Sequence, residues 1–211
     1  MKSAPRVEAG VVVGNVFAKY ESKNPFVHGL VAHFERSLFE LLATIGPARS
    51  ILEVGCGEGY ITSTLAKHFP DATVLGTDVS HTIIAEARAR YPGIEFRPCS
   101  IYDAATLGEW DLVVACEVFE HLDHPARAMQ AVNAACSGHV LLSVPREPLW
   151  RVLNLARGRY WSALGNTPGH VQHWNGRSFR RFVSTHLDIV ATRSPLPWTQ
   201  VLARPRPQAG P

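Results

Sequence analysis

The chain has 211 residues, of which 46% are hydrophobic and 18% are charged, so it can bury one sizeable core but not two. We therefore expect a single domain. No apolar run approaches the roughly 18 residues that a membrane-spanning helix needs, and the N-terminus lacks the apolar core of a secretory signal. The four cysteines are far apart and match no zinc-ligand spacing, which favours reduced thiols in a cytoplasmic protein.

Charge is distributed unevenly along the chain. The formal net charge is +3, yet residues 146–211 contain ten arginines and only two acidic residues. A basic C-terminal third suits an anionic substrate, a lipid headgroup or RNA. A solvated basic face explains the same pattern equally well.

The predicted elements begin after a polar, irregular segment, residues 1–23, which we expect to be flexible. A helix is predicted to start at Asn24-Pro25, where a capping side chain precedes proline, and to end at Gly46-Pro47. Short apolar runs then alternate with helical segments, the pattern of βαβ units in a parallel sheet. Strands are expected at residues 51–54, 73–77, 94–98, 111–116 and 139–144, with helices near 60–68, 81–90 and 125–135.

The alternation stops after the fifth strand. Residues 146–176 are rich in Trp, Arg, Gly and His and have no clean period, so we expect an insertion or lid. A helix near residues 177–186 leads into strands at 188–192 and 199–203, whose short link suits an antiparallel hairpin. The tail, 204–211, is expected to be frayed. The predicted fold is α/β: a Rossmann-like, doubly wound sheet of seven strands, mostly parallel with an antiparallel last strand.

A glycine-rich turn, with Gly55, Gly57 and Gly59, follows the first strand of the predicted sheet. The three glycines permit a tight turn and the close approach of a ligand to the backbone. The dinucleotide fingerprint requires a further glycine where this chain has Tyr60, which argues against NAD. An ordinary turn without a ligand is the alternative interpretation.

Asp78 stands nineteen residues beyond Gly59, at the end of the next strand. A carboxylate at this place can accept hydrogen bonds from both hydroxyls of a ribose. Capping the following helix is a competing role for the same side chain. Together with the glycine turn, Asp78 predicts an adenosine-type ligand.

The Gly-x-Gly-x-Gly spacing, preceded two residues earlier by Glu53, resembles motif I of the class I S-adenosylmethionine-dependent methyltransferases. Residues 77–80 (Thr-Asp-Val-Ser) resemble the second motif of that family, residues 111–122 resemble its fourth-strand motif, and the closing hairpin fits its antiparallel last strand. The resemblance covers about residues 15–190. It implies a methyltransferase with S-adenosylmethionine as cofactor.

The resemblance also implies which residues bind the cofactor. The loop backbone would face the methionine end of S-adenosylmethionine, and Asp78 would bind the ribose. Many relatives carry Asp where this chain has Ser100, in the adenine pocket. The implied cofactor-binding residues are Tyr20 in the N-terminal segment, Glu53, Gly55, Cys56, Gly57, Gly59, Asp78, Val79, Ser100, Ile101 and Glu117.

A Glu-x-x-Glu-His cluster, formed by Glu117, Glu120 and His121, follows the fourth strand, where an open parallel sheet places its ligands. In a helical turn these side chains would project from one face. A hydroxyl acceptor must lose or share its proton before methyl transfer, and His121 could accept that proton. A divalent ion could instead lower the pKa of vicinal acceptor oxygens. A purely structural role is the third interpretation.

The metal interpretation is supported by a resemblance of the cluster to sites in two known enzyme families. The same cluster, with a histidine from a later segment, resembles the metal site of small-RNA 3′-end 2′-O-methyltransferases and a cluster in ubiquinone-pathway O-methyltransferases. His170 is the first choice for the added ligand, so the implied set is Glu117, Glu120, His121 and His170, suited to Mg²⁺ or Mn²⁺. Related enzymes carry the same motif without a metal, with Glu117 lining the cofactor cleft.

These observations predict O-methylation of a small or lipid-linked acceptor, with His121, Glu120 and His170 at the acceptor. Aromatic and Arg residues interleave in residues 145–161, where they could stack on a ring, hold a phosphate, contact a membrane surface or only pack on the sheet edge. A metal-dependent RNA 2′-O-methyltransferase and a non-catalytic cofactor-binding partner protein are the alternatives.

Overall fold

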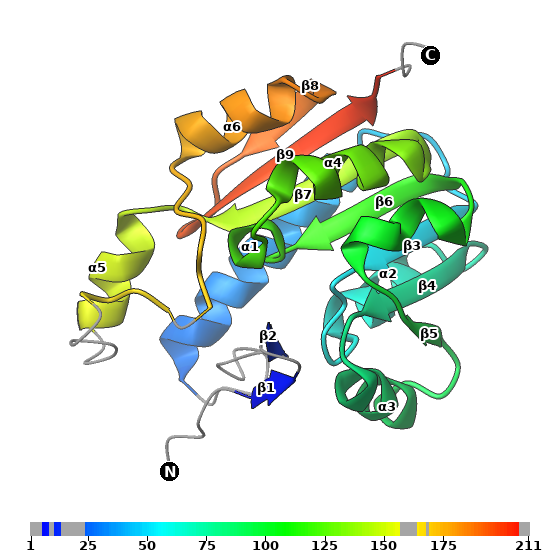
Figure 1. Ribbon diagram of the computed structural model, residues 1–211, viewed down its shortest axis with the longest axis horizontal. Helices are drawn as coiled ribbons and strands as arrows, with labels where there is room; N and C mark the ends of the chain where they lie inside the picture. Colours follow the sequence, from blue (N-terminus) through cyan, green and yellow to red (C-terminus); the bar gives the residue numbers. More distant parts are fainter. Residues whose placement is uncertain (1–5, 9–10, 14–23, 157–163, 168, 207–211) are drawn as a thin grey trace.

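The computed structural model describes residues 6–8, 11–13, 24–156, 164–167 and 169–206 (Figure 1). Seven strands form one mixed sheet in the order β5-β4-β3-β6-β7-β9-β8. The strands from β5 to β7 pair in parallel, whereas β9 runs antiparallel to both β7 and β8. This confirms the predicted fold class. The strands are β3 (Ser50–Val54), β4 (Thr73–Asp78), β5 (Glu95–Pro98), β6 (Trp110–Cys116), β7 (Cys136–Pro145), β8 (Leu187–Arg193) and β9 (Trp198–Pro205).

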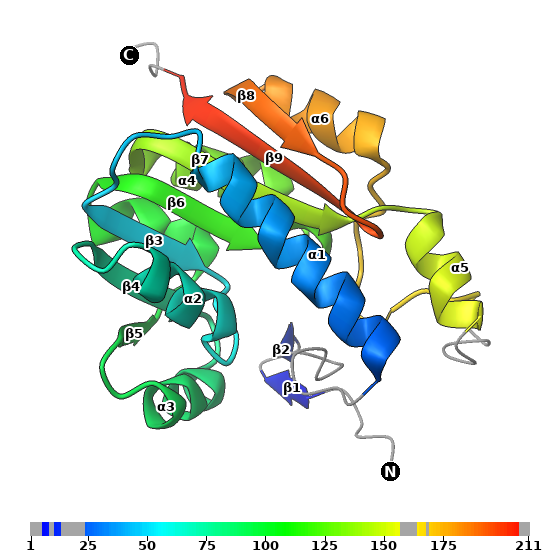
Figure 2. The same cartoon turned by 180° about the vertical axis from the view of Figure 1, so that it is seen from behind.

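Helices cover both faces of the sheet, as Figures 1 and 2 show from opposite sides. On one face, α1 (Pro25–Leu42) and α2 (Tyr60–His68) pack against β3, β6, β7 and β9. On the other, α4 (Pro125–Ala134) and α6 (Gly176–Ser184) bury the second cluster. Helix α3 (His81–Arg90) packs beside the edge strand β5. The central parallel strands β3, β6 and β7 are therefore buried on both sides, which is why they are rich in apolar residues.

The strand order reverses between β3 and β6, because β3 pairs with both β4 and β6. Successive crossovers lead away from this point in opposite directions, so the loops after β3 and β6 meet at the carboxyl edge of the sheet. A Cβ atom added to Gly55, after β3, would collide with the side chain of Val118, after β6. The glycine turn and the Glu-x-x-Glu-His segment are thus in direct contact.

Three segments differ from the sequence prediction. Arg204 and Pro205, which were expected in a frayed tail, continue β9, because the antiparallel ladder with β8 extends to Leu187. Arg6–Glu8 (β1) and Val11–Val13 (β2) pair as an antiparallel hairpin where an irregular segment was expected, because the β-branched valines favour extended backbone. Leu149–Ala156 forms helix α5 within residues 146–176, where no period was recognised. Two turns of helix are too short to reveal a period in sequence. Among the described residues, no helix is both long and apolar enough to cross a membrane.

Candidate active site

The glycine turn between β3 and α2 is a left-handed, backbone-lined loop. Gly55, Gly57 and Gly59 all have positive φ angles, of 70°, 54° and 82°, which cost glycine little. A Cβ atom at Gly59 would lie 2.7 Å from the ring of Phe96. The Gly57 N–H donates to Asp78 Oδ2 at 3.1 Å and so ties the loop to the end of β4. Because these three residues have no side chains, the backbone of the loop stays accessible to a ligand; Cβ atoms at Gly55 and Gly59 would collide with neighbouring side chains.

Asp78 lies where β4 ends. Its second carboxylate oxygen, Oδ1, accepts from the Ser80 N–H at 3.0 Å. Burial raises the pKa of Asp78, and the backbone N–H groups of Ser80 and Gly57 oppose that shift. Ser80, not Asp78, caps α3, because Ser80 Oγ accepts from the Ile83 N–H at 3.2 Å. The competing capping role for Asp78 is therefore wrong, and its remaining lone pairs suit hydroxyl donors.

Glu53 is buried on β3 beneath the loop. Thr62 Oγ1 donates to Glu53 Oε2 at 2.5 Å from the first turn of α2. The pKa of Glu53 is raised to about 8, mainly by burial and in smaller part by the charge of Asp78, while the bond from the Thr62 hydroxyl lowers it. Glu53 therefore keeps a proton at neutral pH in the protein without ligand.

The other predicted cofactor residues occupy varied positions. Val79 is 53% exposed at the rim after Asp78, and Cys56 is buried within the glycine turn. Ser100 caps the 3-10 helix η2 (Ile101–Leu107) by accepting from a backbone N–H in its first turn at 3.3 Å. Ile101 is buried in the core. Tyr20 lies outside the described residues. Contact of these residues with the cofactor stays a prediction.

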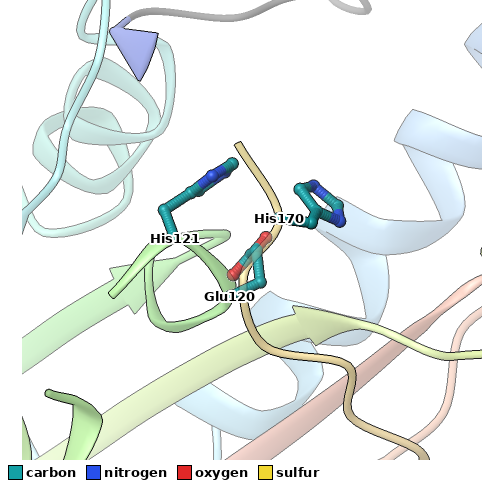
Figure 3. Close-up of side chains that lie close together, drawn as sticks. All are labelled: Glu120, His121 and His170. Atoms are coloured by element: carbon teal, nitrogen blue, oxygen red, sulfur yellow. The ribbon is translucent and has the colours of Figure 1, made fainter. Parts of the chain in front are cut away.

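Glu120, His121 and His170 converge at the carboxyl end of β6. One ligand atom from each lies within 4.8 Å of the other two, and Figure 3 shows the side chains approaching from two segments. Glu120 and His170 are buried, whereas His121 is partly exposed. Two imidazoles and a carboxylate are ligands that a divalent transition ion accepts, and they can equally hold or move a proton. The donor set therefore fits a metal.

Glu117, the fourth residue of the predicted metal set, is not part of that three-residue group. Its φ angle of 63° is uncommon for a residue other than glycine, and its N–H donates to Ser143 O of β7 at 3.0 Å. The 3-10 helix η3 begins only afterwards, at Phe119. The prediction that one helical turn presents Glu117 beside Glu120 and His121 is wrong, because the left-handed residue interrupts the turn.

The turn that carries Glu120 is clamped by the segment that carries His170. The backbone N–H groups of Val171 and Gln172 both donate to Glu120 O, at 2.9 and 3.0 Å. The Gln172 side chain adds a bond from Nε2 to Leu122 O at 3.1 Å. These bonds join segments about fifty residues apart and hold the imidazole of His170 against Glu120.

A further contact across the same junction sets the tautomer of His121. Its Nδ1 lies 2.9 Å from Gly169 O. Since a carbonyl oxygen only accepts, Nδ1 carries the proton and Nε2 is the basic nitrogen of the neutral ring. His121 is thereby prepared to accept a proton or to ligate an ion through Nε2.

Helix α5 contacts the segment that carries His170, and this contact was not predicted from the sequence. Trp150 Nε1 donates to Thr167 Oγ1 at 2.9 Å, and the indole stacks on the His170 ring with centroids 6.4 Å apart. The buried Asn154 donates to Gly165 O at 2.9 Å and to Thr167 Oγ1 at 3.1 Å. The four-residue spacing of Trp150 and Asn154, one helical turn, was the available signal.

Comparison with known sequences identifies relatives. A family model described as a methyltransferase domain matches residues 28–186. Trans-aconitate 2-methyltransferase of Methylobacterium nodulans is 32% identical over 131 residues, 58% of this chain and 50% of that protein. A probable S-adenosylmethionine-dependent methyltransferase of Mycobacterium tuberculosis is 32% identical over 108 residues, 51% of this chain and 39% of that protein. The chain spans about half or less of the length of these relatives.

Solved structures show the same fold. Magnesium protoporphyrin IX methyltransferase from Synechocystis with bound S-adenosylhomocysteine superposes with a TM-score of 0.62 at 18% identity, covering 86% of this chain and 88% of that one. An N-methyltransferase from Bradyrhizobium japonicum in complex with S-adenosylhomocysteine gives 0.61 at 19% identity, covering 88% and 90%. With most of its length matched by the family model, this chain belongs to the methyltransferase domain family.

Proposed function

We propose that the enzyme transfers the methyl group of S-adenosylmethionine to an oxygen atom of a small or lipid-linked acceptor. One observation carries this proposal: Glu120, His121 and His170 converge beside the glycine turn, where the loops after β3 and β6 meet. A hydroxyl oxygen is a weak nucleophile until its proton is removed, and His121 Nε2 is a suitable proton acceptor at that place.

Each residue has a distinct role in this scheme. The cofactor, when bound, supplies an electrophilic methyl group. His121 takes the hydroxyl proton at Nε2 as the acceptor oxygen gains the methyl group, and its Nδ1–H keeps the ring oriented through Gly169 O. The Glu120 carboxylate stabilises the resulting imidazolium, and His170, stacked on Trp150, orients the acceptor.

A panel of acceptors tests the proposal. Labelled S-adenosylmethionine would be incubated separately with three acceptors: trans-aconitate, catechol, and a short single-stranded RNA with a free 3′ end. Trans-aconitate is included because it appears in the names of some relatives. We expect label in a small molecule and, with the hydroxyl acceptor catechol, a loss of roughly a hundredfold or more in His121→Asn. An ionised carboxylate has no proton to lose, so transfer to trans-aconitate would not require His121 as a base. His33→Asn, an exposed change on α1, is the matched control. Label in RNA alone, or transfer to a hydroxyl oxygen that His121→Asn leaves intact, would overturn the proposal.

The spacing of the three donors favours a metal-assisted form of the same reaction as the second candidate. Glu120, His121 and His170 would hold the ion, and it would lower the pKa of adjacent acceptor oxygens. Mn²⁺ would be titrated by calorimetry into chelator-treated protein saturated with S-adenosylhomocysteine. We expect one ion per chain, abolished in His170→Ala and retained in Glu117→Gln. Absence of binding would leave His121 as the proton acceptor and remove the analogy to RNA 2′-O-methylation.

A further inference from the structure

A second polar cluster lies on the α6 side of the sheet, where β7 ends and β9 begins. A Cβ atom added to Gly176, the first residue of α6, would lie 3.4 Å from Arg180 Nη1, 3.4 Å from Thr199 Oγ1 and 4.0 Å from Arg146 Cδ. Side chains from α6, from β9 and from the residue after β7 therefore surround one point. We call Arg146, Arg180 and Thr199 the arginine cluster.

Two buried polar atoms of the arginine cluster have no hydrogen-bond partner in the described part of the chain. Thr199 is fully buried, and its Oγ1, like Arg146 Nε, is buried with no hydrogen-bond partner among the described residues. An unsatisfied buried donor costs about 1–3 kcal/mol, so such groups are found where a ligand or water completes them. Gly176 contributes by having no side chain to occupy the shared space.

The carboxylate adjacent in sequence does not neutralise the cluster. Glu147 is buried on the α5 side, where its Oε2 lies 3.9 Å from Arg151 Nε. Burial raises the pKa of Glu147, and the charges of Arg151 and His173 lower it. Glu147 is also the only acidic residue between positions 124 and 187 of the sequence. Neither Arg146 nor Arg180 forms an ion pair with a carboxylate of the described residues. Two arginines that lie beside one point and lack such a partner suit an anion.

The arginine cluster is joined to the proposed acceptor site by a short segment of chain. Gly176 follows His170 by six residues, which limits the separation of their Cα atoms to about 21 Å even for extended backbone. The connecting segment is bonded near both ends: the Val171 N–H donates to Glu120 O, and Trp174 O accepts from the Glu147 N–H at 2.8 Å. The segment from His170 to Gly176 therefore links the two sites.

We propose that Arg146, Arg180 and Thr199 bind an anionic group of the methyl acceptor, a carboxylate or a phosphate. The inference rests on the proposed function, since it assigns a charge to the acceptor of that reaction. Both guanidinium groups donate to the anion, and the Thr199 hydroxyl adds a neutral donor. A carboxylate and a phosphate both accept hydrogen bonds from guanidinium and hydroxyl groups. Binding experiments with each anion therefore decide which of the two the cluster prefers.

Binding of simple anions tests the cluster without any turnover. Inorganic phosphate and trans-aconitate would be titrated separately into the cofactor-free protein and followed by calorimetry. We expect saturable binding of one of them, weakened roughly tenfold or more in Arg180→Gln and in Thr199→Val. Arg181→Gln removes the same charge from an exposed neighbour on α6 and is the matched control. Equal weakening in Arg181→Gln, or no saturable binding of either anion, would overturn the inference.

Kinetics with a methylated acceptor separates this inference from the proposed function. In Arg180→Gln we expect a higher KM for an anionic acceptor with kcat retained, because the contact is the same before and during transfer. Thermal unfolding of each variant checks that the fold is intact. Anion binding without any O-methyl transfer would refute the proposed function alone. O-methyl transfer to an anionic acceptor that Arg180→Gln leaves unchanged would refute the arginine cluster alone.

Discussion

The two parts of the proposed site are built in different ways. We call the glycine turn with Glu53 and Asp78 the cofactor half, and Glu120, His121 and His170 the acceptor half, after their proposed roles. In the cofactor half, side-chain bonds join near neighbours in sequence: Thr62 to Glu53, nine residues apart, and Gly57 to Asp78, twenty-one apart. In the acceptor half, His121 and Gly169 are forty-eight residues apart, and Leu122 and Gln172 are fifty apart. One βαβ unit completes the first, whereas the second requires an inserted segment to dock. The cofactor half is therefore a property of the fold, and the acceptor half is a property of the insertion.

The same contrast appears in how the halves are supported. The glycine turn lies against the central strands and a buried Glu53. The acceptor half depends on α5, whose buried Asn154 and partly buried Trp150 hold the loop that carries His170. Segments with fewer apolar contacts open at lower free energy than the core. Changes to α5 should therefore impair the acceptor site while sparing the cofactor site, and changes to the glycine turn should impair both.

The largest effect is expected from Gly55→Ala. Alanine at this position would have to keep the left-handed φ of 70°, and its methyl group would collide with the Val118 side chain. The free energy of unfolding should therefore fall by about 3 kcal/mol. S-adenosylhomocysteine affinity should fall by at least roughly tenfold. Gly93→Ala, where the added atom has open space within 4 Å, is the control. Thermal unfolding and calorimetry measure both effects, and equal behaviour of the two variants would contradict the assigned strain.

A smaller effect, confined to the acceptor half, is expected from Asn154→Ala. Loss of the bonds to Gly165 O and Thr167 Oγ1 should lower stability by about 2 kcal/mol and release the His170 loop. Methyl transfer should slow while S-adenosylhomocysteine affinity stays unchanged. Asn133→Ala removes an exposed pair of bonds to Arg206 and should change neither. A loss of cofactor affinity in Asn154→Ala would break the proposed separation of the halves.

The smallest effect, counted as free energy of unfolding per pH unit, is the pH dependence of stability that Glu53 confers. The pKa of Glu53 is about 8 in the folded protein and 4.5 when unfolded, so between these values only the folded chain holds the proton. The stabilisation present below pH 4.5 is lost as pH rises toward 8, by about 1.4 kcal/mol per pH unit. Denaturant unfolding across this range should show a weaker decline in Glu53→Gln. Parallel curves for the two proteins would contradict a protonated Glu53.

The sequence by itself determined the fold class, the alternation of strands and helices, and the glycine turn that we propose binds the cofactor. Apolar runs that alternate with helices form a parallel sheet whose faces the helices cover, and Gly55, Gly57 and Gly59 act through their own backbone. Such properties depend on residues that are close together in sequence, so the sequence alone can predict them. The Glu-x-x-Glu-His segment and His170 were likewise predicted as partners, and the structure brings three of the four together.

Only the tertiary structure decided which residues share the acceptor site and how they are oriented. The left-handed backbone of Glu117 depends on its bond to β7, and the tautomer of His121 depends on Gly169 O. Arg146 and Arg180 meet at Gly176 because α6 packs over the end of the sheet. These contacts join residues far apart in sequence, whose pairing is selected by packing and not by local backbone preference. Neither the periodicity nor the spacing of residues in a single sequence predicts which of these distant residues will be in contact.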